Sequence, residues 1–237
     1  MKNFPKKIPK DKRFSPFFST ELQINFHSAC EQNNIELVNF FINNRLIPKN
    51  YLNEEVSNVI EAKNLQLLKI LINNGAEMPY KATLYAVWTE DIEVINYILN
   101  YYTENPCYDA NFCHKALCFA AEFSKNLSLI KFLVHKCPSI KSYCSALENA
   151  ICMDSYEVAN YLIKLGANLD TCAQGVIFTV MSSTEADKIH NAEKLNFLID
   201  HGVSIEEIKM YTKILKSDYC CDDISIINFI NQHNEKK

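Results

Sequence analysis

The chain has 237 residues, with 24 Lys and Arg, 28 Asp and Glu, and only four glycines. Average glycine usage of about 7% would give roughly 17, and no G-x-G or G-K-S/T string occurs, which excludes the glycine-rich phosphate loops of nucleotide-binding proteins. Residues 1–20 carry six basic side chains and one acidic one, so this segment has a charge of +5 and the remainder −9. An acidic body argues against binding along a nucleic-acid backbone.

The first 20 residues are basic, but no apolar stretch of the secretory-signal kind follows the charges. No uninterrupted apolar run approaches the 18 or so residues of a membrane span. We therefore expect a soluble intracellular protein that binds neither a membrane nor a nucleic acid. Pro5, Pro9 and Pro16 favour an extended, flexible leader over residues 1–20. The same charges also suit a nuclear signal or a signal for an anionic partner.

One pattern returns seven times after this leader. Two polar residues precede apolar positions at helical spacing, as in Leu37, Val38, Phe41 and Ile42 of the first copy. The copies are 27 to 36 residues apart when they are anchored on Glu36, Gln66, Glu93, Ser128, Glu157, Glu193 and Ser225. The pattern predicts a series of amphipathic helices of about three turns each.

A second, shorter helix is predicted a few residues before each of the first six copies. Each of these segments has a small residue near its middle: 26–30, 56–62, 84–88, 117–123, 147–151 and 176–181. Two helices in each period, joined by a short turn, predict an all-α array of antiparallel helix hairpins. No segment of comparable strength alternates as a β-strand does.

The repeated unit resembles the ankyrin repeat, which has a period near 33 and a first helix with T-P-L-H-x-A. Residues 26–30 are similar to the L-H-x-A-A part of that helix, and residues 117–121 are similar again. Residues 73–77, 164–168 and 200–204 look like the closing G-A element. The resemblance covers roughly residues 22–232. It implies an ankyrin-like α-solenoid of about six repeats plus a C-terminal helical cap, within a domain of residues 21–237.

Three of the four glycines share one position of the repeat. Gly75, Gly166 and Gly202 follow the second helix directly, where a left-handed residue lets the chain leave the helix. In other copies this position falls near Arg45, Tyr102 and Cys137. At those positions we expect either backbone strain in a non-glycine residue or a different conformation where the chain leaves the helix.

Ten cysteines in a long chain without an export signal favour reduced thiols over disulfides. The strongest metal candidates are Cys107, Cys113, His114 and Cys118, with Cys137 and Cys144 downstream, because His114 and Cys118 would share a helical face. No C-x-x-C pair supports zinc, so the preferred interpretation is cysteine in the core or in loops. No Cys/His pair is marked as a nucleophile either, and we expect no enzymatic activity and no cofactor.

Other charged positions have structural interpretations. Glu36, Glu93, Glu157 and Glu193 recur one repeat apart and are expected on a solvated face. His201 stands beside Gly202, which suits a partner for the C-terminal end of a helix. The ankyrin resemblance implies that His27 bonds to neighbouring backbone.

The resemblance also implies that the last turn of each first helix faces a concave groove. The segments between hairpins are short for the β-hairpin fingers of the family, which favours recognition by the helices. Transfer by position gives Glu31, Gln32, Glu61, Ala62, Trp88, Thr89, Glu122, Phe123, Cys152, Met153, Met181 and Ser182 as groove residues. Of these, Trp88, Phe123 and Met153 are residue types that anchor protein interfaces.

The resulting hypothesis is a monomeric scaffold or adaptor whose groove binds another protein, with acidic side chains that favour a basic partner. Similar degenerate, Asn- and Ile-rich ankyrin proteins occur in large DNA viruses of protists and in intracellular bacteria, which points to a host-directed effector in the host cell cytoplasm. Two alternatives are open. One is a zinc-binding or catalytic module built on the cysteines and histidines. The other is a purely structural array in which Trp88 packs between repeats.

Overall fold

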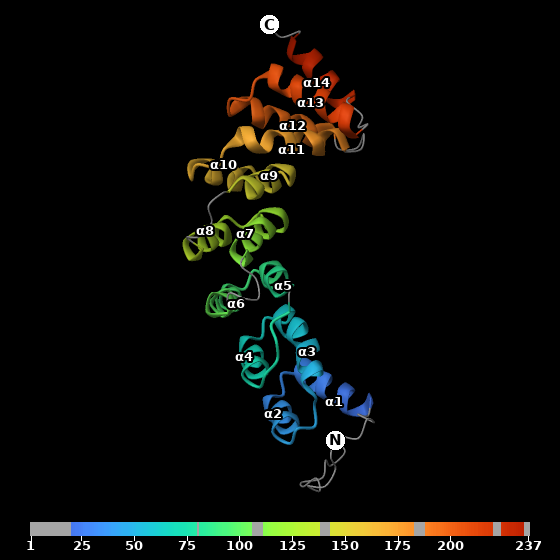
Figure 1. The fold of residues 1–237 in the computed structure, drawn as a ribbon, viewed down its shortest axis with the longest axis vertical. Coiled ribbons are helices and arrows are strands. Elements are labelled where there is room, and N and C mark those ends of the chain that lie inside the picture. The colour runs from blue at the N-terminus through green and yellow to red at the C-terminus, as the bar shows by residue number, and fades with distance from the viewer. Residues whose placement is uncertain are drawn as a thin grey trace. The chain divides into compact units, whose positions relative to one another are not determined.

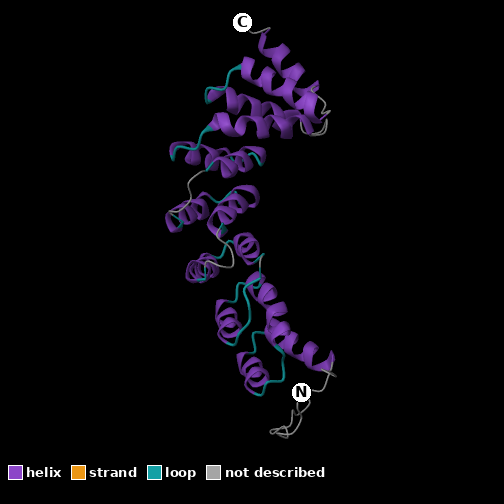
Figure 2. Cartoon of the chain, in the orientation of Figure 1, coloured by secondary structure: helices purple, strands orange, loops and turns teal. Residues whose placement is uncertain are grey.

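The computed structural model describes residues 20–79, 81–105, 111–137, 143–182, 188–219 and 224–234. Within these ranges the chain forms fourteen α-helices and no strand (Figure 2). The all-α prediction is therefore confirmed. The chain divides into two compact units, residues 1–85 and 86–237, where the sequence predicts one repeat domain over 21–237.

The first unit contains two helix hairpins. Its helices are α1 (Thr20–Glu31), α2 (Ile35–Asn43), α3 (Lys49–Glu61) and α4 (Leu65–Asn73), and α5 (Ala82–Thr89) crosses the boundary to the second unit. Helix α1 packs on α2, α3 packs on α4, and α1 packs on α3. The first helices of the two hairpins are therefore neighbours.

The second unit repeats this arrangement. Its helices are α6 (Ile92–Glu104), α7 (Phe112–Phe123), α8 (Leu127–Lys136), α9 (Cys144–Cys152), α10 (Tyr156–Lys164), α11 (Leu169–Ser182), α12 (Lys188–Asp200), α13 (Ile205–Tyr219) and α14 (Ile224–Asn234). Helices α7, α9, α11 and α13 pack on one another in that order, and α8 and α10 lie beside them as the second helices of their hairpins (Figure 1).

The side chains that pack the helices together, within a hairpin and between neighbouring hairpins, follow the predicted pattern. In the first unit, Phe26 of α1 meets Phe41 of α2 edge to face, with ring centroids 5.8 Å apart, and both rings are buried. In the second unit, the small residues of α7 and α9 are fully buried where these helices pack together: Ala116, Ala120, Ala146 and Ala150. Alanine at such positions lets helix backbones approach closely, and the surrounding leucines fill the core.

A tight turn joins the two helices in the five hairpins whose connecting residues the structure describes, from α1–α2 to α9–α10. The second helix begins at a polar N-cap in four hairpins: Asn34, Asn64, Asp91 and Asn126 each accept a hydrogen bond from a backbone N–H of the first turn. Such caps contribute about 1 kcal/mol each, and they account for the polar residues that start these four copies of the sequence pattern. The residue before the N-cap is left-handed in several turns, with positive φ at Asn33, Lys63, Glu90 and Asp154.

Some of these left-handed residues also join one hairpin to the next. In the first unit, Asn64 Nδ2 donates to Asn33 Oδ1 at 2.7 Å. In the second unit, Asn126 Nδ2 donates to Glu90 Oε2 at 3.0 Å, and the Ser124 hydroxyl donates to Glu90 Oε1. Consecutive turns are thereby held side by side.

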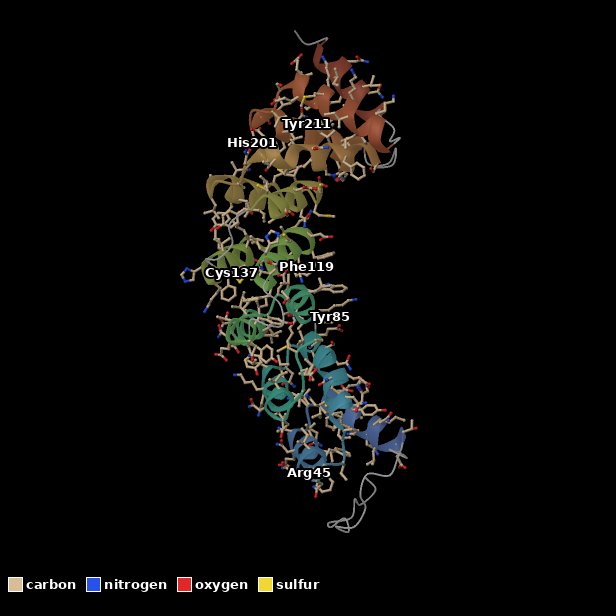
Figure 3. The ribbon with its side chains drawn as sticks, viewed as in Figure 1. Arg45, Tyr85, Phe119, Cys137, His201 and Tyr211 are labelled. Carbon is tan, nitrogen blue, oxygen red and sulfur yellow. A yellow bond between two sulfur atoms is a disulfide. The ribbon has the colours of Figure 1, made fainter. Side chains whose placement is uncertain are left out.

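The prediction that three glycines directly follow second helices, in a left-handed conformation, is confirmed. Gly75, Gly166 and Gly202 follow second helices with φ of +92°, +92° and +103°. Arg45 occupies the equivalent place after α2 with φ of +54°, so this arginine takes the left-handed conformation that glycine takes elsewhere (Figure 3). At Cys137 the chain leaves α8 by a different exit, with φ of −117°.

The assignment of Tyr102 to this exit position is wrong. Helix α6 continues to Glu104, and Tyr102 is a buried residue inside it. Its ring stacks on Phe112 of α7 with centroids 5.3 Å apart, which keeps the last turn of α6 in the core. The copy is therefore longer than its neighbours because its second helix is longer.

The fourth glycine has another cause. Gly175 lies inside α11, and a Cβ there would come within 2.1 Å of Glu148 Oε1 on α9. Glycine at this position leaves room for the Glu148 side chain between two neighbouring helices. Burial raises the pKa of that carboxyl above its ordinary value.

One pair of cysteines departs from the prediction of reduced thiols. Cys113, near the start of α7, and Cys137, the C-cap residue of α8, form a disulfide with a Cα–Cα distance of 5.7 Å. Because the two helices of a hairpin are antiparallel, the start of one lies beside the end of the other. The sequence could not show this proximity, since the two residues are 24 positions apart.

The strained exit at Arg45 gives a stability test. Replacing Arg45 with Gly should raise the free energy of unfolding by up to about 1 kcal/mol, because glycine adopts positive φ without a Cβ clash. The converse variant, Gly75→Ala, should lower it by about 1 kcal/mol, since a Cβ there meets nothing within 4 Å and only backbone strain remains. Urea denaturation measures both values. A loss of stability in Arg45→Gly would contradict the assignment of Arg45 to the left-handed position after α2.

Candidate binding surfaces

A cleft of about 510 Å³ opens in the first unit at the C-terminal ends of α1 and α3. We call it the N-terminal cleft, and its lining residues are His27, Cys30, Glu31, Glu55, Asn58, Val59, Glu61, Ala62, Asn64 and Leu67. Three of them, Glu31, Glu61 and Ala62, are residues that the sequence assigns to the groove. Its volume lies in the range of about 300–1,000 Å³ that is usual for ligand pockets.

His27 joins two acidic side chains across this cleft. Its Nδ1 lies 2.9 Å from Oε1 and 3.1 Å from Oε2 of Glu55 on α3, and its Nε2 lies 3.3 Å from Oε1 of Glu31 on its own helix. Only the doubly protonated ring can donate at both nitrogens. The hydrogen bond to Glu55 accordingly raises the pKa of His27 above its ordinary value, against the opposing effect of burial.

The expectation that His27 bonds to neighbouring backbone is wrong. Its partner is the Glu55 carboxylate, which is 7% exposed and also accepts a hydrogen bond from Asn58 Nδ2 at 3.2 Å. Glu55 and Asn58 are cleft residues that the sequence reasoning missed. A polar residue in the middle of an apolar helix face was the available signal, because a buried carboxylate needs a partner.

In the second unit, large apolar side chains are exposed at the ends of first helices. Trp88 is 73% exposed at the end of α5, Phe123 is 59% exposed at the end of α7, and Met153 is 44% exposed directly after α9. We call these three the apolar turn residues. Trp88 and Phe123 each stand three positions before an N-cap, and the bonds from Glu90 to Ser124 and Asn126 hold their two turns together.

Other groove residues of the sequence prediction have different surroundings. Glu31, Gln32 and Ser182 are exposed, and Glu122 and Cys152 are half-buried. The hydroxyl of Thr89 donates to the Ala86 carbonyl at 2.8 Å and accepts from the Asp91 N–H at 3.3 Å, so it serves the turn itself.

Met181 does not belong to the surface. It is 3% exposed, because α11 is 14 residues long and its last turn is still packed in the core. The groove position transferred from the shorter first helices is therefore wrong for Met181. The exposed large side chain of α11 is Phe178, one turn earlier, at 38%.

The cysteines and histidines do not assemble a metal site in the described parts of the chain, where no three His, Cys, Asp or Glu side chains are grouped so that they could hold an ion. Cys107 lies outside those parts. Cys113 and Cys137 are joined to each other, while Cys118 Sγ lies 3.6 Å from His114 Nε2. Burial raises the pKa of the Cys118 thiol to about 11, which leaves it protonated and a poor nucleophile.

The remaining charged positions behave as the sequence predicts. Glu36, Glu93, Glu157 and Glu193 are all exposed. His201 follows the end of α12, where its Nδ1 lies 2.8 Å from the carbonyl oxygen of Phe197 and its ring stacks on the Phe197 ring (Figure 3). His201 is thus a partner for the C-terminal end of a helix.

The chain matches no protein-family model, no curated protein and no solved structure. Among the helices that the structure describes, none combines the length and the apolar character needed to cross a membrane. The N-terminal cleft and the apolar turn residues are therefore the two candidate binding surfaces.

The contact between His27 and Glu55 predicts a pH dependence. Because the folded state raises the pKa of His27, the stabilisation is complete below the ordinary value of 6.5 and is lost as the pH rises through the raised pKa. The free energy of unfolding, measured by denaturant titration, should fall over that window. In His27→Gln the fall should be absent, whereas the exposed His135→Gln should keep it. An unchanged pH profile in His27→Gln would contradict the contact.

Proposed function

We propose that this protein is an ankyrin-like repeat scaffold that binds another protein through the ends of its first helices. The observation that carries the proposal is the exposure of Trp88 and Phe123 at equivalent positions of consecutive hairpins, 73% and 59%. Large aromatic side chains cost free energy when they face water, and they supply most of the binding energy where a partner covers them.

The backbone around these two residues supports a preformed surface. Thr89 and Asp91 fix the turn after Trp88, and Ser124 and Asn126 fix the turn after Phe123. The carboxylate of Glu90 bonds to the second turn and so sets the spacing between them. A rigid surface loses little conformational entropy on binding, which favours affinity.

The charge of the chain indicates the chemistry of the partner. Residues 21–237 carry a net charge of −9, and Glu122 directly precedes Phe123 while Glu90 stands two positions after Trp88. Acidic side chains around an apolar centre accelerate association with a basic surface and disfavour an acidic one. We therefore propose a protein partner whose contact surface combines an apolar pocket with Lys or Arg residues.

The proposal is tested by affinity capture from the native cell with the full chain and with the double variant Trp88→Ala/Phe123→Ala. A partner captured by the full chain should be lost by the double variant. With the purified partner, the dissociation constant should rise at least about 30-fold, which corresponds to about 2 kcal/mol for the loss of an aromatic anchor.

The matched control is Met210→Ala/Ile227→Ala, which removes two apolar side chains of the same unit that are 48% and 44% exposed. This control should bind as the unchanged chain does. Equal capture by all three proteins would contradict the proposal. Self-association of the chain without any captured partner, tolerant of Trp88→Ala, would instead indicate a structural array.

A further inference from the structure

The N-terminal cleft carries more negative charge than its own residues neutralise. Glu31, Glu55 and Glu61 line it, and His27 is the one basic side chain among the lining residues. His27 is shared between Glu55 and Glu31, and no ion pair reaches Glu61 from the described part of the chain. At neutral pH the cleft therefore presents uncompensated carboxylates to a ligand.

The helices add to this negative potential. Glu31 is the last residue of α1 and Glu61 the last residue of α3, and neither helix has a basic side chain in its last turn. The C-terminal end of a helix carries a partial negative charge and is stabilised by cations. Two carboxylates at two such ends are electrostatically unfavourable, and a cation between them would relieve both.

The cleft also has an apolar floor. Val59 is 3% exposed, Leu67 is fully buried, and Cys30 is buried with a pKa raised by burial to about 12. A ligand with an aliphatic stem and a cationic head fits such a surface, because the stem covers the floor while the head meets the carboxylates. Lysine and arginine side chains have this form.

The chain itself contains such side chains in the segment that precedes α1 in the sequence. Residues 1–19, outside the described part of the chain, contain Lys2, Lys6, Lys7, Lys10, Lys12 and Arg13 and a single acidic residue. Helix α1 begins at Thr20, and Glu31 lies about 16 Å further along its axis at about 1.5 Å per residue. The seven residues from Arg13 to Thr20 span up to about 23 Å when extended, so basic side chains can reach the cleft.

We propose that the basic N-terminal segment, residues 2–13, binds in the N-terminal cleft of its own chain and places a lysine or arginine side chain between Glu31 and Glu61. The segment then covers Glu31, Glu61 and Ala62. It would compete with any basic partner for this cleft. This inference is independent of the apolar turn residues and stands if they bind nothing.

Zero-length carbodiimide cross-linking of the full chain, followed by mass spectrometry, tests the proposal. Amide bonds should form between Lys6, Lys7, Lys10 or Lys12 and Glu31 or Glu61. Their yield should fall at high salt, because exposed charges are then screened. Mixing isotopically labelled and unlabelled chains should give cross-links within one chain and no mixed pairs.

A peptide titration provides a second readout. The variant Lys6→Gln/Lys7→Gln/Lys10→Gln/Lys12→Gln frees the cleft, so it should bind a fluorescent peptide of residues 1–19 at least tenfold more tightly than the unchanged chain. Adding Glu31→Gln/Glu61→Gln to that variant should abolish the gain. The control Glu36→Gln/Glu54→Gln removes the same charge from exposed positions outside the cleft and should keep it.

Three results would overturn the proposal. The first is cross-linking of Glu31 and Glu61 no greater than that of Glu36 and Glu54. The second is cross-linking only between differently labelled chains, which would assign the cleft to a second copy. The third is equal peptide binding by the neutralised and the unchanged chains.

Discussion

The tight turn between the two helices of a hairpin is the constraint on which this structure depends. A polar N-cap such as Asn64 or Asn126 begins the second helix, and a left-handed residue such as Lys63 reverses the chain just before it in several hairpins. Because the turns in the described connections are short, the end of the first helix and the start of the second are fixed relative to each other. The apolar faces of both helices then pack on the neighbouring hairpin, because a single hairpin could not bury these faces alone.

The same turns determine where functional side chains emerge. The residues just before a turn cannot be covered by their own hairpin, so their character decides what that part of the surface binds. In the first unit they are the acidic Glu31 and Glu61, which line a cleft over a buried Glu55. In the second unit they include Trp88 and Phe123, which are exposed and apolar. One backbone geometry therefore presents two different chemistries.

Much of this architecture could be predicted from the sequence, because local signals define it. The N-caps, the helical spacing of apolar residues and the glycines after second helices all act within a few residues of one another, and they predict the helix hairpins and the strained place of Arg45. Contacts between residues far apart in the sequence have no such signal. The contact between His27 and Glu55, the disulfide of Cys113 with Cys137 and the space that Gly175 leaves for Glu148 join residues at least 24 positions apart.

Helix length was the other quantity that local patterns left undetermined. Tyr102 and Met181 are buried because α6 and α11 are 13 and 14 residues long, whereas the neighbouring α8 and α9 have 10 and 9. A register transferred from the shorter helices therefore assigns these two residues wrongly. The same transfer places Trp88 and Phe123 correctly at the ends of their helices, because each stands only three residues before an N-cap.

Trp88 is the one tryptophan of the chain. Its fluorescence therefore tests most directly whether the exposed aromatic side chains bind a partner. In the free protein we expect red-shifted emission that acrylamide quenches efficiently, because the indole is 73% exposed. Addition of the captured partner should shift the emission of the chain to the blue and protect it from quenching, with Trp88→Phe providing the background from the partner. Emission that is already blue-shifted and protected in the free chain, or that does not change in the complex, would contradict a partner-binding role for Trp88.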